Sequence, residues 1–163
     1  MEPINQEIKI NVDPNALKQK GNDALKAEKY DQAISLYQEA LKVSQNYSKY
    51  LFKTTEEQNQ LLSVLNLNLA VCYFHKNELD KSLNLCDQAL EYNPTYLKAH
   101  YRKALIFEKV NKLAEAFELV KKLLTIEKSN PDCLKLKVFL SPRLRVLSAK
   151  PFRSHLRKGS ESQ

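Results

Sequence analysis

The sequence predicts an all-α protein in which three helical hairpins stack on one another and a short helix caps the stack. Two observations predict this class. The 163-residue chain contains only two glycines, so it lacks the residues that tight β-hairpin turns and phosphate-binding loops require. The chain also repeats itself at offsets of 49 and 34 residues, and a period of about 34 residues is typical of stacked helical hairpins. We therefore expect one helical domain.

The repeated segment is twelve residues long and would form the second helix of each hairpin. It reads YDQAISLYQEAL at 30–41, LDKSLNLCDQAL at 79–90 and LAEAFELVKKLL at 113–124. A second block lies upstream of each copy at the same spacing, and it carries a small residue where two helices would cross: Gly21, Ala70 and Ala104. Because no hairpin buries its apolar face alone, the three copies must stack to form a core. The repeats would span about 14–47, 63–96 and 97–130.

Capping residues mark where the expected helices begin. Asp13 before Pro14 predicts the start of the first helix, and Asn130 before a proline predicts another helix start in the same way. The segment TTEEQ at 54–58 predicts a capping-box start for a long helix that runs to about His75. Fifteen extra residues separate the first two repeats relative to the 34-residue period. We interpret them as a lengthening of the second and third helices.

After the third repeat we expect a short capping helix over 131–140. Leu134, Val138 and their neighbours would cover the exposed end of the stack, and Pro142 would end the helix. The helical domain would thus extend over 13–140.

The two ends of the chain lie outside the expected domain. Residues 1–12 form an N-terminal extension, and 141–163 form a basic tail that we expect to be disordered. The tail holds six basic residues against one glutamate, so it carries +5 of the net charge of +7 and the other 140 residues carry +2. A helical domain whose positive and negative charges are so nearly balanced is not expected to bind polyanions in general, although it can still hold a local basic surface.

Nothing in the sequence predicts secretion, a membrane span, a metal site or catalysis. The N-terminus lacks a basic start and an apolar run, and polar residues interrupt the longest apolar stretch, 61–74. The three cysteines have the spacing of neither a disulfide framework nor a zinc site. No nucleophile with a base is suggested, and no carboxylate or cysteine set accompanies the histidines: His75, His100 and His155. We expect a cytoplasmic monomer that is not an enzyme and binds no metal, cofactor or small-molecule substrate.

The period, the small crossing residues and Pro94 at the end of the second repeat together resemble the tetratricopeptide repeat. The resemblance covers about four-fifths of the chain and implies a right-handed superhelical stack. The long helices after the first repeat are similar to those in the C-terminal tetratricopeptide domain of large immunophilins and related co-chaperones. In those families the first helix of each hairpin lines a concave groove.

Five polar residues on the expected first helices match a pattern known from these co-chaperones as the carboxylate clamp. Lys18 and Asn22 share a helical face, as do Lys98 and Arg102, while Asn68 lies one 34-residue period before Arg102. The resemblance implies that these five side chains bind a peptide ending in Glu-Glu-Val-Asp. Such a peptide is the C-terminus of the cytosolic seventy- and ninety-kilodalton heat-shock chaperones.

The residue types suit this ligand independently of the family. A C-terminal aspartate presents two carboxylates, and lysine, arginine and asparagine supply the N–H donors that carboxylates need. Apolar residues on the same faces are candidates to contact the preceding peptide residues: Leu25, Val71, Phe74 and Leu105.

Two alternatives place the function elsewhere on the chain. The basic tail, with its interleaved apolar residues, would bind nucleic acid or an anionic membrane. A scaffold would instead bind a fixed partner through an apolar stripe on the second helices, and no clear stripe is present. We expect neither nucleic acid nor membrane as the main partner.

Overall fold

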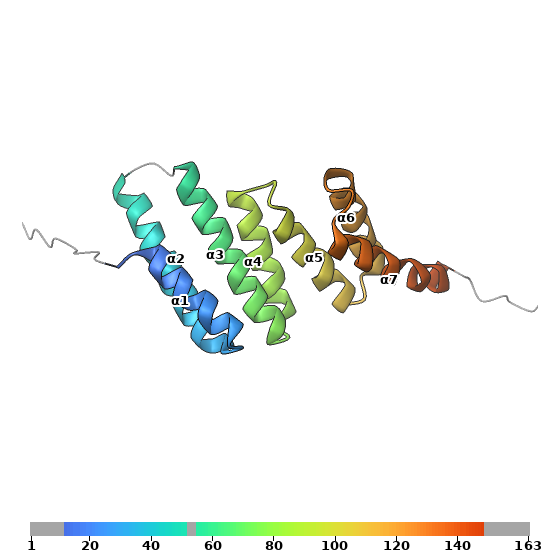
Figure 1. Ribbon diagram of the computed structural model, residues 1–163, viewed down its shortest axis with the longest axis horizontal. Coiled ribbons are helices and arrows are strands. Elements are labelled where there is room, and N and C mark those ends of the chain that lie inside the picture. The colour runs from blue at the N-terminus through green and yellow to red at the C-terminus, as the bar shows by residue number, and fades with distance from the viewer. Residues whose placement is uncertain (1–11, 52–54, 149–163) are drawn as a thin grey trace, which may run out of the picture.

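The computed structural model describes residues 12–51 and 55–148, and within these residues it contains seven α-helices and no strand (Figure 1). The helices are α1 (Pro14–Lys26), α2 (Tyr30–Leu51), α3 (Glu56–His75), α4 (Leu79–Tyr92), α5 (Leu97–Lys109), α6 (Leu113–Ile126) and α7 (Pro131–Ser148). They pack side by side in chain order, with α1 and α2 at one end and α6 and α7 at the other (Figure 1). The predicted stack of three hairpins and a terminal helix is confirmed.

Capping side chains hold the helix starts where the sequence predicts them. An Asp13 carboxylate oxygen accepts the Asn15 N–H at 2.9 Å, and the Thr55 hydroxyl accepts the Gln58 N–H at 3.2 Å. The amide oxygen of Asn130 accepts the Cys133 N–H at 3.0 Å. Each cap satisfies an N–H group that has no partner within its own helix.

The turn of each hairpin contains one residue in the left-handed region of backbone space. Glu28, Asn77 and Asn111 have φ values of 57°, 62° and 61°, and their positions are spaced by the same 49 and 34 residues as the repeats. Asparagine tolerates this conformation better than most residues, which explains how the second and third hairpins close without glycine, while Glu28 adopts it in the first.

The crossing of α1 and α2 depends on Gly21. A methyl group at Gly21 would lie 2.5 Å from Cε1 of Tyr37, whose side chain is fully buried. The equivalent small residues Ala70 and Ala104 are also fully buried. At the second crossing the Ser82 hydroxyl donates to the carbonyl oxygen of Ala70 at 2.7 Å, so the backbones approach closely there too.

Three contiguous apolar clusters run along the stack. The first joins α1, α2 and α3, the next joins α3, α4 and α5, and the last joins α5, α6 and α7. Each hairpin therefore buries its apolar face against the next, as the repeat requires. The extra residues after the first repeat lengthen two helices, because α2 and α3 have 22 and 20 residues whereas α1, α4, α5 and α6 have 13 or 14.

The expected capping helix over 131–140 was too short, because α7 runs to Ser148 with Pro142 inside it. Pro142 has no N–H group, so the backbone hydrogen bond to the carbonyl oxygen of residue 138 is missing. The helix continues because its apolar face extends beyond the proline. Leu136 and Leu140 are buried, and Leu144 packs against the same cluster. Arg143 also forms an ion pair with Glu108 of α5, with 2.6 Å between nitrogen and oxygen.

This longer α7 changes two further expectations. Residues 141–148 of the expected disordered tail are helical, while 149–163 and 1–11 lie outside the described residues. The helix covers the stack with its Cys133, Leu136 and Leu140 face rather than with Leu134 and Val138, which are 41% and 72% exposed. The prediction chose the wrong face of the helix because both faces carry apolar residues. The 3.6-residue helical period therefore does not distinguish the Leu134 and Val138 face from the Cys133, Leu136 and Leu140 face.

Among the described helices, none is both long and apolar enough to cross a membrane.

Candidate peptide-binding face

The surface formed by α1, α3 and α5, called here the α1–α3–α5 face, carries all five residues that the sequence pattern singled out. Helix α3 contacts both α1 and α5 directly, so side chains from the three hairpins can approach one another. Asn22 and Lys18 lie on α1, Asn68 on α3, and Lys98 and Arg102 on α5.

The two asparagines are in direct contact. The Nδ2 group of Asn68 donates to Oδ1 of Asn22 at 3.0 Å, and the hydroxyl of Tyr37 on α2 donates to the same oxygen at 2.8 Å. Burial raises the pKa of the Tyr37 hydroxyl, which therefore stays protonated and remains a donor at neutral pH. The three side chains thus form a network that joins the first hairpin to the second.

This network sets the orientation of the two amides. The Asn22 oxygen accepts two hydrogen bonds, while within the described residues no acceptor pairs with its Nδ2 group. Both asparagines are partly exposed, and the described chain has no buried polar side-chain atom without a partner, so the remaining N–H groups are open to a ligand. Oδ1 of Asn22 already accepts two hydrogen bonds, whereas its Nδ2 group still has N–H donors available. The amide therefore favours a ligand that accepts hydrogen bonds, such as a carboxylate.

Arg102 is a partly buried cation. Its guanidinium carbon lies 5.0 Å from the centre of the Phe74 ring, and burial lowers the pKa of the group. In the described part of the chain Arg102 forms no ion pair, whereas its neighbour Lys103 pairs with Asp87 at 2.5 Å. A desolvated cation without a counter-ion has a strong tendency to bind an anion.

The two lysines of the pattern lie farther from the asparagines. Lys18 is one turn before Asn22, and its Nζ donates to Oδ1 of Asn15 at 2.9 Å. Lys98 is exposed and lines a cavity of about 190 Å³ between α5, α6 and α7, together with the acidic residues Glu127 and Asp132. Within the described residues no hydrogen bond joins either lysine to Asn22 or Asn68.

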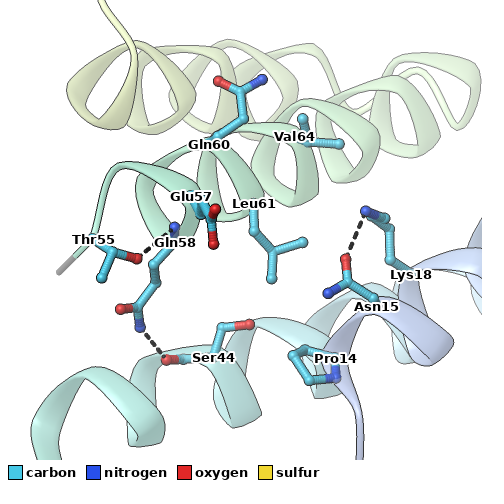
Figure 2. A pocket seen from close by; sticks show the side chains of 10 residues that line it. All are labelled: Pro14, Asn15, Lys18, Ser44, Thr55, Glu57, Gln58, Gln60, Leu61 and Val64. Carbon is cyan, nitrogen blue, oxygen red and sulfur yellow. Dashed lines mark hydrogen bonds between the residues drawn. The ribbon is translucent and has the colours of Figure 1, made fainter. Parts of the chain in front are cut away.

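Lys18 also borders a cavity of about 400 Å³ that the lengthened helices create (Figure 2). Its walls come from the start of α1, from α2 near Ser44 and from the first turns of α3, where Leu61 and Val64 provide apolar surface. The Gln58 side chain donates to the Ser44 carbonyl oxygen at 2.8 Å and ties the extended part of α2 to α3 (Figure 2).

The four apolar candidates have different surroundings, although all are partly buried. Leu25 packs against the first apolar cluster and Leu105 against the last, so both contribute to the core. Phe74 lies beneath Arg102. Val71 lies on α3, one turn after Asn68.

Two residues of the site were not identified from the sequence. Tyr37 was not considered as a candidate, yet its hydroxyl donates to the amide oxygen of Asn22. Lys109 was not considered, yet its Nζ lies 4.7 Å from the centre of the Phe74 ring. A signal for Lys109 was present, because it follows Arg102 by seven residues and so lies on the same helical face.

The two described histidines contact neighbouring groups at or near the surface, and the cysteines are buried in the core. The His75 ring stacks on Tyr30 with 5.1 Å between ring centres, and a ring nitrogen of His100 lies 2.9 Å from the Pro94 carbonyl oxygen. His155 lies outside the described residues. The three cysteines are buried and free, and no group of three metal-ligating side chains was found among the described residues.

Comparison with known proteins identifies the repeat. Two models of the tetratricopeptide repeat match residues 18–54 and 64–96. Among solved structures, the first tetratricopeptide domain of Spaghetti (RPAP3) bound to the HSP90 peptide SRMEEVD is 27% identical and has a TM-score of 0.67, covering 83% of this chain and 98% of that one. UNC-45 from C. elegans in complex with a Hsp90 peptide is 25% identical with a TM-score of 0.67, covering 82% of this chain and 14% of that one.

Similar sequences belong to much longer proteins. Protein unc-45 homolog B of Danio rerio is 30% identical over 118 residues, which are 72% of this chain and 12% of that protein. The human mitochondrial import receptor subunit TOM70 is 33% identical over 112 residues, which are 69% of this chain and 17% of that protein. The chain therefore spans less than a fifth of the length of these relatives.

Proposed function

Because the chain is built from tetratricopeptide repeats, we propose that it is a co-chaperone adaptor that binds the acidic C-terminal tail of a heat-shock chaperone on its α1–α3–α5 face. The ligand is a peptide ending in Glu-Glu-Val-Asp, as in the cytosolic seventy- and ninety-kilodalton chaperones. The residues proposed to hold its terminal carboxylates are Lys18, Asn22, Asn68, Lys98 and Arg102. The protein acts by binding and not by catalysis.

The observation that carries the proposal is the hydrogen bond between Asn22 and Asn68, at 3.0 Å. It brings an amide from the first hairpin and an amide from the second to one point and leaves N–H groups open there. A C-terminal residue with a free carboxylate is a suitable ligand, since each carboxylate oxygen can accept two hydrogen bonds without adding a donor of its own.

Arg102 supplies the charge that the amides lack. Its partly buried guanidinium forms no ion pair in the described chain, so binding a carboxylate would give it a counter-ion without breaking an existing pair. Lys18 and Lys98 extend the positive potential on either side, on α1 and α5. The arrangement favours an anionic peptide over a neutral one.

The comparisons support this choice of ligand. The RPAP3 domain and UNC-45 were both solved with an HSP90 peptide, and their identity to this chain is 27% and 25%. The peptide on the RPAP3 domain, SRMEEVD, ends in the sequence that the pattern of five residues implies.

A simple balance of contributions gives the expected affinity. Each charge-assisted hydrogen bond contributes about 1.5 to 3 kcal/mol, and ordering each residue of an extended peptide costs about 1 to 2 kcal/mol. Four or five such bonds against four ordered residues leave a surplus of only about 4 kcal/mol, so apolar contacts must supply the remainder of the affinity. We expect binding in the micromolar range, about −8 kcal/mol.

The test is a calorimetric titration of the peptide into three variants. Lys98→Glu and Arg102→Ala should each weaken binding by roughly tenfold or more, because each removes a charge that the peptide carboxylates contact. Lys122→Glu is the matched control, since it makes the same charge change on the exposed surface of α6. It should change the affinity by less than about threefold, because salt screens distant charges. Equal affinities for all three variants would contradict the proposal.

A further inference from the structure

Phe74 on α3 contacts the side chains of two cations that both come from α5. The guanidinium carbon of Arg102 lies 5.0 Å from the centre of the Phe74 ring, and the Nζ of Lys109 lies 4.7 Å from the same centre. The two positive groups are therefore no more than about 10 Å apart. A cation–π contact with the ring favours positions of both cations close to Phe74.

Neither cation has a counter-ion in the described chain. Arg102 and Lys109 form no ion pair within residues 12–51 and 55–148, whereas Glu108, which lies between them in sequence, pairs with Arg143. Lys109 is exposed and so is accessible to a ligand. Two like charges on one ring repel each other, and an anion between or beside them relieves that repulsion.

The spacing of the two cations fits a peptide. The residues are seven apart on α5, and their charged groups are separated by at most about 10 Å, because both lie within 5.0 Å of the same ring centre. An extended chain rises about 3.3 Å per residue, so this distance corresponds to about three peptide residues. If Arg102 holds the carboxylate of the C-terminal residue, Lys109 reaches the side chain three positions before it.

We propose that Lys109, held against Phe74, is a specificity-determining residue that binds an acidic side chain three positions before the peptide C-terminus. In a peptide ending in Glu-Glu-Val-Asp this is the first glutamate. The inference rests on the proposed function, and it adds a second subsite that selects acidic tails among all tails that end in a free carboxylate.

A structural explanation for Lys109 leads to a different outcome. A basic residue also occurs in the last turn of α1 and of α3, at the equivalent positions Lys26 and His75, where a positive charge favours the helix dipole. If stabilising the end of α5 were the whole role of Lys109, its replacement would alter stability but not the choice between peptides.

The experiment is a double-mutant cycle measured by calorimetry on the full chain. The peptides are Glu-Glu-Val-Asp with a neutral N-terminal extension and the same peptide with its first glutamate replaced by glutamine. The unmodified chain should bind the first peptide about two- to fivefold more tightly, the range expected for an exposed ion pair. Lys109→Gln should abolish this preference, and Lys109→Arg should retain it.

Lys112→Gln is the matched control, because Nζ of Lys112 also lies over an aromatic ring, that of Phe107 at 5.9 Å. It should leave the preference for glutamate unchanged. The inference is overturned if Lys109→Gln keeps the preference, or if Lys112→Gln loses it to the same extent. An amidated peptide, included as a third ligand, reports on the proposed function separately. If the unmodified chain binds the amidated and free-acid peptides equally, or binds no peptide at all, the proposed function and this inference both fail.

Discussion

The substitution Gly21→Ala tests the close crossing of α1 and α2 on which the site is built. An added methyl group would lie 2.5 Å from Cε1, 2.8 Å from Cδ1 and 3.0 Å from Cζ of Tyr37. Gly21 does not have a positive φ, so alanine can adopt its backbone conformation and the effect comes from contact alone. The Tyr37 side chain has no exposed surface and is enclosed by the first apolar cluster, so the ring has little space to move away.

The expected cost is the sum of three contributions. Overpacking of a tight core costs about 1 to 3 kcal/mol. Moving Tyr37 also strains or breaks the 2.8 Å hydrogen bond between its hydroxyl and Asn22, which contributes about 1 kcal/mol. Replacing a helical glycine by alanine returns about 1 kcal/mol of helix propensity. The net effect is a loss of about 1 to 3 kcal/mol in the free energy of unfolding.

The assay is urea unfolding followed by helical circular dichroism, with Lys20→Ala as the control. Lys20 is the exposed neighbour on the same helix, so its replacement by the same residue should change the free energy of unfolding by less than about 0.5 kcal/mol. Peptide affinity should also fall for Gly21→Ala, because Asn22 is displaced with Tyr37. A Gly21→Ala protein as stable as the unmodified chain, or more stable, would refute the claim that this crossing has no room.

Three further outcomes follow from the structure. Tyr37→Phe should lower the free energy of unfolding by about 0.5 to 1.5 kcal/mol and weaken peptide binding, since Asn22 loses a donor; urea unfolding and calorimetry measure the two effects. Arg143→Ala should speed amide hydrogen exchange in the last turns of α7, beyond the proline, because it removes the ion pair with Glu108, and unchanged exchange would contradict that role. Burial raises the pKa of the Cys72 thiol from 9.0 to about 11, so the unfolded chain releases this proton first. The free energy of unfolding should therefore be insensitive to this group below about pH 9 and fall as the pH rises toward 11, and Cys72→Ala should reduce that fall in urea titrations at pH 8, 9 and 10.

The helical stack was predictable because its signals are local: a small crossing residue recurs in each repeat, and side-chain caps mark the starts of α1 and α3. The small crossing residues Gly21, Ala70 and Ala104 and the capping residues Asp13 and Thr55 act through contacts with nearby parts of the chain. Such signals depend only on the spacing of residues along the chain, so they can be recognised in one sequence without a structure.

The length of α7 was not predictable in the same way. Pro142 is a strong local stop signal, and it was overruled by tertiary contacts of residues on both sides of it. Leu140 and Leu144 pack in the apolar cluster that joins α5, α6 and α7, and Arg143 pairs with Glu108 on α5. The cost of one lost backbone hydrogen bond is offset by packing that only the folded stack reveals.

In the candidate site, too, some features were predictable from the sequence spacing and others depend on tertiary contacts. Spacing placed Asn22 and Asn68 on one face, and the structure brings them into contact. The hydroxyl of Tyr37 and the ring of Phe74 acquire their roles only through helix crossing, because Tyr37 is fifteen residues from Asn22 and Phe74 is on a different helix from Arg102 and Lys109. Patterns within one helix could not have revealed either contact.

The binding of an acidic C-terminus is tested most directly by comparing one peptide in two chemical forms. A peptide ending in Glu-Glu-Val-Asp, with either a free or an amidated C-terminus, is titrated calorimetrically into the unmodified chain. Amidation removes one negative charge and replaces an acceptor oxygen by a donor, so it places an N–H group against the open N–H groups of Asn22 and Asn68. The free acid should bind in the micromolar range and more weakly as salt is added, and the amide should show no measurable binding. Equal affinity for the two forms would contradict the central claim.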